Sequence, residues 1–109
     1  MRVLKFIVDG TTIKPDPTCD FNGLFPGRDN EIIAEFTFSS EWKSRLKVAA
    51  FWSILDKEYP PQIVNDDGTC IIPIEALSKV AFKMQIIGRG RDVKVETDCL
   101  TIYQRGSKQ

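Results

Sequence analysis

Histidine is absent from this sequence, and the other residue types that carry enzyme chemistry are not grouped to act together. The 109-residue chain has no histidine, the commonest general base and transition-metal ligand. Carboxylates alone could do acid–base chemistry, but the acidic pair Asp66 and Asp67 lies in a turn sequence. A calcium loop there would need further oxygen ligands at defined offsets. We therefore expect no catalytic residues, no cofactor and no metal, and we predict that the protein is not an enzyme.

The cysteines also favour a structural role. Cys19, Cys70 and Cys99 are odd in number, widely separated and without a CxxC pair. A zinc site would lack its usual imidazole ligand. We predict that all three side chains are small apolar fillers.

The charges give no general attraction for polyanions. Fifteen basic and fifteen acidic residues cancel, so no overall field draws nucleic acid or an anionic membrane. Arg89 and Arg91 in "GRGRD", with Arg105, Lys108 and Tyr103, could form a local basic rim. Because exposed turns and tails are commonly charged for solubility, we expect no nucleic-acid partner.

The start of the chain and its hydropathy predict no membrane attachment. "MRVLKFIV" is shorter than a signal peptide and is followed at once by Asp9 and Gly10. No apolar run approaches the length of a membrane span. We expect synthesis and folding in the cytosol, with no membrane partner.

Period-two hydrophobicity dominates the chain. Apolar side chains alternate over the stretches 3–8, 34–38, 46–52 and 82–87, which predicts strands. Both faces of 46–52 are largely apolar, so we predict a central strand covered on both sides, with Trp52 in the core. Val95 and Leu100 fall on opposite faces, which predicts a break near Thr97 and Asp98.

Turn signals separate these stretches. The sequences 65–68 and 88–92 predict hairpin connections, and 73–79 predicts one short helical turn that begins with proline. The stretch 9–31, rich in proline and glycine, predicts a long loop, and 104–109 a polar tail. Together these features predict one all-β domain over residues 1–109, a sandwich or an open barrel.

The positions of the large aromatic and apolar side chains outside the regular strands suggest what they do. In "SSEWKSR", Trp42 lies in a link between strands, and we predict that it folds over the open end of the sandwich as a plug. The predicted structural residues are Trp42, Phe36, Phe38, Phe51 and Phe82. In the long loop, Phe21, Leu24 and Phe25 either cover one edge of the sandwich or form a contact patch for another protein.

The pattern from about residue 31 to 106 resembles that of small proteins encoded among bacteriophage and prophage tail and baseplate genes. The resemblance is carried by "IIAEFTFSSEW", "LKVAAFW", "DDGTCIIPIEAL", "FKMQIIG" and "TDCLTIYQRGS". It implies an immunoglobulin-like or related β-sandwich and a structural role in the virion, assembled in the bacterial cytoplasm. The implied partners are other phage structural proteins or further copies of the chain.

Two functions remain open at this point. In the first, the chain is a tail, baseplate or fibre-attachment protein that contacts partners through Phe21, Leu24 and Phe25, and through Arg89 and Arg91. In the second, it is a small phage-encoded protein that binds and inhibits a host protein. Carbohydrate binding would require several aromatic side chains on the surface, and the prediction that Trp52 lies in the core argues against it.

Overall fold

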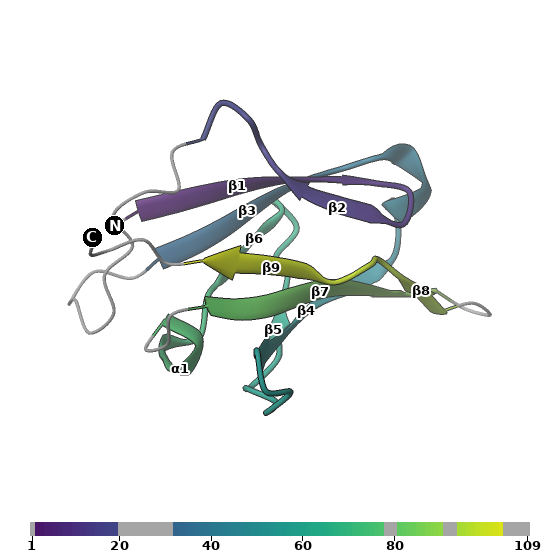
Figure 1. The fold of residues 1–109 in the computed structure, drawn as a ribbon. Helices are drawn as coiled ribbons and strands as arrows, with labels where there is room; N and C mark the ends of the chain where they lie inside the picture. The colour runs from purple at the N-terminus through teal and green to yellow at the C-terminus, as the bar shows by residue number, and fades with distance from the viewer. Residues whose placement is uncertain (1, 20–31, 78–80, 91–93, 104–109) are drawn as a thin grey trace.

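Two β-sheets lie face to face and form a sandwich (Figure 1). The computed structural model describes residues 2–19, 32–77, 81–90 and 94–103. The first sheet has the strand order β2-β1-β3-β6, and its strands are β1 (Arg2–Asp9), β2 (Thr12–Pro15), β3 (Ile32–Phe38) and β6 (Thr69–Ile71). The predicted all-β sandwich is confirmed.

The second sheet has the order β5-β4-β7-β8, and a further strand, β9, also pairs with β7. Its strands are β4 (Leu46–Ser53), β5 (Gln62–Ile63), β7 (Ala81–Arg89), β8 (Lys94–Glu96) and β9 (Leu100–Tyr103). A short 3-10 helix, η1 (Ser40–Trp42), links β3 to β4, and α1 (Ile74–Leu77) precedes β7. The helix lies inside the predicted stretch 73–79.

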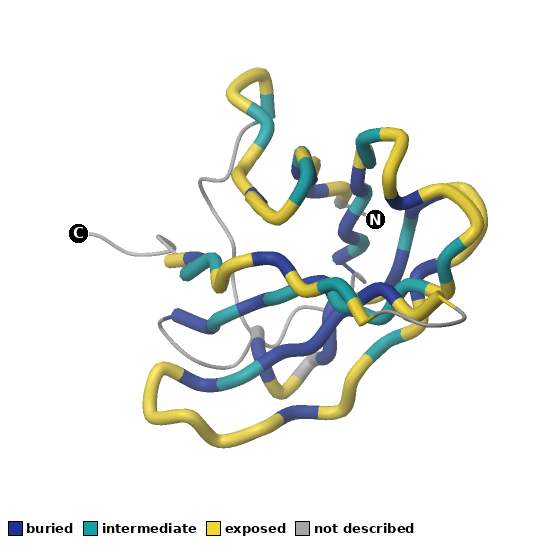
Figure 2. The backbone as a smooth tube through the Cα atoms, turned by 90° about the vertical axis from the view of Figure 1, so that its right-hand side faces the viewer, coloured by how far each residue is buried: buried dark blue, intermediate teal, exposed yellow. Residues whose placement is uncertain are grey.

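The core lies between the sheets because alternate side chains of each strand point inward. Leu4, Phe6 and Val8 of β1 and Phe51 of β4 are all almost completely buried. Figure 2 shows the exposed residues concentrated in the turns. Burial of these side chains contributes about 1.5–3 kcal/mol each to folding, which makes the interior the main source of stability.

The pairing inside the first sheet is mixed. β1 runs antiparallel to β2 but parallel to β3, with Val3 opposite Ile33 and Val8 opposite Phe38. Parallel neighbours need a crossover connection. In this chain the crossover spans β2 and the residues between β2 and β3. The loop predicted over 9–31 is therefore partly wrong, because Ile13 anchors β2 in the core.

The turn at 65–68 has the predicted tight geometry but a different role. The Asn65 amide donates to Thr69 O at 2.8 Å, and Gly68 has a φ of 85°. Its flanking strands nevertheless belong to different sheets, since β5 pairs with β4 and β6 pairs with β3. The hairpin prediction is corrected: this turn carries the chain from one layer to the other.

The hairpin predicted at 88–92 is present, although Gly88 and Arg89 belong to β7 and not to the turn, and the later strand break follows the prediction. β7 and β8 pair antiparallel with Arg89 opposite Lys94. The break between β8 and β9 falls at 97–99, as predicted. Buried Thr97 holds it: its amide donates to Ile86 O and its hydroxyl accepts from the Ile86 amide, both at 3.0 Å.

Asp98 connects this break to the first sheet. Its carboxylate accepts a hydrogen bond from the Ile13 amide at 3.0 Å, and its own amide donates to Thr11 O at 2.9 Å. Since Ile13 belongs to β2, these bonds close one side of the sandwich.

We expect Asp98→Ala to lower the free energy of unfolding by about 1–2 kcal/mol, because the Ile13 amide loses its acceptor. Urea denaturation measures the change. Asp66→Ala, which removes an exposed carboxylate elsewhere, is the control and should change the value by less than about 0.5 kcal/mol. Equal effects from the two variants would contradict the inter-sheet role of Asp98.

Candidate interaction surface

The link between β3 and β4 organises one end of the sandwich. Trp42 is completely buried, and its indole N–H donates to Gly10 O, in the β1–β2 turn, at 2.8 Å. Ser39 Oγ accepts from the Gly10 amide at 2.9 Å. A Cβ on Gly88 of β7 would lie 2.6 Å from the Trp42 ring, so the indole lies directly against the second sheet. Trp42 thus contacts both layers.

The other residues predicted to be structural lie around this end and in the core. Phe36, Phe51 and Phe82 are buried, and Phe38 is half-buried against the core. The ring centroids of Phe38 and Trp42 are 5.6 Å apart. The aromatic series therefore extends from the core to the closed end.

Beside this end lies a groove of about 600 Å³, called the basic groove below. It is lined by Lys43, Ser44, Arg45, Leu46, Lys47, Val64, Asn65 and Asp66. Two backbone contacts fix its long side chains: Arg45 Nε donates to Glu41 O at 3.1 Å, and Lys47 Nζ donates to Arg45 O at 3.1 Å. Lys47 Nζ also lies 5.2 Å from the centroid of the Phe38 ring.

The acidic residues near this end are stabilised as carboxylates. A hydrogen bond from Ser39 lowers the pKa of Glu41, and hydrogen bonds from Thr69 lower the pKa of Asp67. The Asp67 carboxylate accepts from both the hydroxyl and the amide of Thr69, at 2.6 and 3.1 Å. The Asp67 carboxylate therefore stabilises the turn. The carboxylate that lines the groove is that of Asp66.

A second hollow of about 240 Å³ lies on the outer face of the second sheet. It is lined by Trp52, Asp56, Lys83, Gln85 and Cys99, and Lys83 forms an ion pair with Asp56. The prediction that Trp52 belongs to the core is wrong, because the outer face of β4 is only partly covered and leaves the indole half-buried. For the same reason β4 is not covered on both sides, although β5 and β7 flank it.

The turn after β4 displays two large apolar side chains that the sequence reasoning missed. Ile54 is 53% exposed and Leu55 is 87% exposed. Ser53 Oγ accepts from the amides of Leu55 and Lys57 at 3.1 and 2.9 Å, which fixes the turn. The sequence signal was available, since a serine at the end of a strand can bond the amides that follow it.

The residues predicted to contact partners are only partly placed. Arg89 is exposed at the end of β7, opposite Leu46 of β4 and so beside the basic groove. Phe21, Leu24, Phe25 and Arg91 lie outside the described residues. The contact role of these residues stays a prediction.

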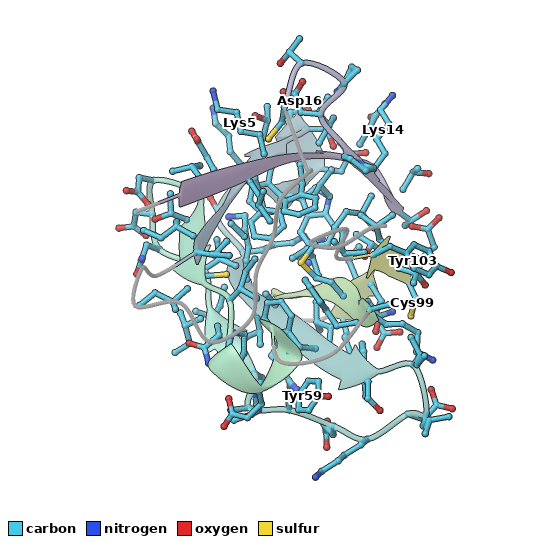
Figure 3. All side chains as sticks on the ribbon, turned by 60° about the vertical axis from the view of Figure 1, so that its left-hand side comes forward. Lys5, Lys14, Asp16, Tyr59, Cys99 and Tyr103 are labelled. Carbon is cyan, nitrogen blue, oxygen red and sulfur yellow. The ribbon has the colours of Figure 1, made fainter. Side chains whose placement is uncertain are left out.

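The three cysteines occupy three different environments. Cys70 is buried, Cys19 is half-buried against the core and Cys99 is exposed, so the filler prediction is wrong for Cys99. Figure 3 shows Cys99 and Tyr103 on the same side of the molecule. Burial raises the pKa of the Cys70 thiol to about 12.

We expect a thiol-alkylating reagent to modify Cys99 rapidly at about pH 8, because alkylation requires an accessible thiolate. Cys70 should react only after denaturation. Peptide mapping by mass spectrometry after timed exposure to iodoacetamide measures both rates. Modification of Cys70 in the folded protein at the rate of Cys99 would contradict this placement.

Neither a metal centre nor a membrane span is found in the part of the chain that the structure describes. No group of three or more Cys, Asp or Glu side chains there could hold a metal ion. No described helix is long and apolar enough to cross a membrane. What these residues do offer is apolar and cationic surface.

The comparisons with known proteins give a fold relationship. No protein-family model matches the sequence, and no curated protein matches it. Among solved structures, the chain is similar to the N-terminal domain of phage TP901-1 ORF48. The TM-score is 0.62 at 13% sequence identity, over 95% of this chain and 98% of that domain. The fold is shared. At this identity the likeness shows the fold alone.

Proposed function

We propose that this chain is a non-enzymatic structural or assembly protein of a bacteriophage tail, baseplate or fibre-attachment region, and that it acts through protein–protein contacts. The observation that supports this proposal most is the likeness to a phage protein domain along nearly the whole length of both chains. The resemblance of the strand and turn sequences to tail-associated proteins points the same way. In this proposal the protein works in the virion.

The surface is compatible with a contact role. Large apolar side chains are exposed on both sheets and on the turn after β4. The exposed set includes Val3, Leu46, Ile54, Leu55, Ile63, Ile71 and Tyr103. Contiguous apolar surface commonly marks a site of association, since its burial against a partner is favourable.

The proposal is tested by the protein content of purified virions. Particles of a phage that carries this gene should contain the protein in a fixed ratio to the tail proteins, as measured by quantitative mass spectrometry. Deletion of the gene should produce particles with incomplete tail tips in electron micrographs. Virions that lack the protein while infected cells contain it would contradict the proposal.

The same experiment separates the proposal from the alternative of a host-directed inhibitor. An inhibitor would be present in infected cells but absent from particles. It would also capture one stoichiometric host protein from a lysate of uninfected cells. That pair of results would replace the structural role with inhibition.

A further inference from the structure

The outer face of the second sheet has an apolar row at the end where β5, β4 and β7 meet. Val48 of β4 pairs with Ile63 of β5 on one side and with Ile87 of β7 on the other. Opposed residues on neighbouring strands project to the same face. Leu46 lies two residues before Val48 and therefore also on this face. Leu46 and Ile63 are 55% and 65% exposed.

Cations border this row where it meets the basic groove. Lys43 is exposed, and Arg89 lies opposite Leu46 in the pairing of β4 with β7. Neither side chain forms an ion pair with another described residue. Lys47 also lines the groove, but it alternates with Leu46 and Val48 along β4, and its ammonium donates to Arg45 O. The carboxylate that lines the groove is that of Asp66, so positive charge is in excess here.

Two other cations of the same face are paired with carboxylates. Lys83 pairs with Asp56 near Trp52, and Lys94 pairs with Glu96 on β8, the latter at 2.9 Å. Because the whole chain has no net charge, the excess of cations at the basic groove is a local feature. It lies next to exposed aliphatic side chains, whose burial against an apolar partner is favourable.

We propose that this face, formed by the basic groove and the row Ile63, Val48 and Ile87, docks a protein segment that carries aliphatic side chains next to acidic ones. The inference rests on the proposed function, because it names the chemistry of a partner for the contact role. Aliphatic side chains of the segment cover Leu46 and Ile63, and its carboxylates face Lys43 and Arg89. Charges at the border then set the orientation and the rate of association.

Nucleic acid fits the same face less well. Binding of single strands uses aromatic side chains on which bases stack, alongside the cations. Among the described residues, the lining of the basic groove includes no aromatic side chain, and its apolar members are Leu46 and Val64. Aliphatic surface beside cations instead favours a segment of acidic protein.

The test uses the full-length, isotope-labelled protein and a short synthetic peptide of alternating leucine and glutamate. Addition of the peptide should shift the backbone amide signals of residues 43–48, 63–66 and 87–89 in heteronuclear NMR spectra. A matched peptide of alternating leucine and glutamine should bind about tenfold more weakly at low salt. Equal binding of the two peptides, or shifts confined to another face, would overturn the proposal.

Charge reversal locates the site. The double variant Lys43→Glu with Arg89→Glu should bind the acidic peptide about tenfold more weakly. The matched control reverses Lys5 of β1 and Lys14 of β2, exposed cations of the first sheet (Figure 3), and should bind as the wild type does. If the control variant loses as much affinity for the acidic peptide, the effect of charge is general and the proposed location of the site is wrong. Duplex DNA shifting the same amides more strongly than the peptide would also overturn it.

The two proposals fail separately. If the protein is absent from virions but binds the acidic peptide at this face, the docking site stands and the virion role is wrong. If the protein is present in virions but does not bind the peptide, the virion role stands and the proposed docking site is wrong.

Discussion

Replacing Trp42 with alanine is expected to lower the free energy of unfolding by about 3–5 kcal/mol, the range for loss of a large aromatic core residue. The indole is completely buried, bonds Gly10 O and lies against Gly88, so its removal leaves a cavity between the layers. Gly10 O also loses its indole donor. A domain of this size has a net stability of about 5–15 kcal/mol, so this loss is a large fraction of the total and the variant should melt well below the wild type.

Thermal denaturation followed by circular dichroism measures this effect. Trp52→Ala is the matched control, because it removes the same side chain from the half-buried outer face of β4. We expect the control to cost about 1 kcal/mol. A Trp42→Ala protein with the melting temperature of the wild type would show that Trp42 does not close the sandwich.

Gly68→Ala is expected to lower the free energy of unfolding by about 2–4 kcal/mol, from a strained backbone and a steric clash together. Gly68 has a φ of 85°, which L-residues rarely adopt. A Cβ there would lie 2.6 Å from Phe36 O, and that oxygen belongs to the backbone of β3. The Phe36 amide also donates to Gly68 O at 2.8 Å, so the two segments cannot separate without losing this bond.

Gly10→Ala separates the two causes. Gly10 has a φ of 61°, but the nearest atom to a Cβ is Glu41 Oε2 at 3.6 Å, an ordinary contact. We expect Gly10→Ala to lower the free energy of unfolding by about 1–2 kcal/mol, from the strained backbone alone. Urea denaturation of both variants gives the comparison. A Gly10→Ala loss that equals or exceeds the Gly68→Ala loss would contradict the clash at Phe36.

The strands of the sandwich could be predicted because their inward side chains alternate. Leu4, Phe6 and Val8 all lie in the core of the observed β1. The break at Thr97 was also visible, since the apolar face changes sides there. Local periodicity carries this information without any knowledge of the neighbouring strands.

Pairing between distant segments could not be predicted in the same way. β2 is short and has one buried side chain, Ile13, and its amide is held by Asp98, 85 residues later. The turn at 65–68 has hairpin chemistry, and nothing local shows that its flanking strands belong to different layers. Tertiary contacts decide both cases.

The candidate interaction surface was predictable only in fragments. Arg89 was singled out from its glycine-rich turn, but Lys43, Leu46 and Ile63 were not, because they come together through the pairing of β5, β4 and β7. Trp52 was assigned to the core because both faces of β4 are apolar. An apolar outer face of a sheet looks the same in sequence whether another layer or another protein covers it.

Contact of Trp42 with both layers is the feature on which the sandwich and its outer docking face depend most directly. Nuclear Overhauser spectroscopy on the labelled full-length protein measures that contact. We expect cross-peaks from the Trp42 indole protons both to residues of the β1–β2 turn at Gly10 and to the Cα protons of Gly88. Cross-peaks to one of these segments and not the other would contradict the two-layer arrangement.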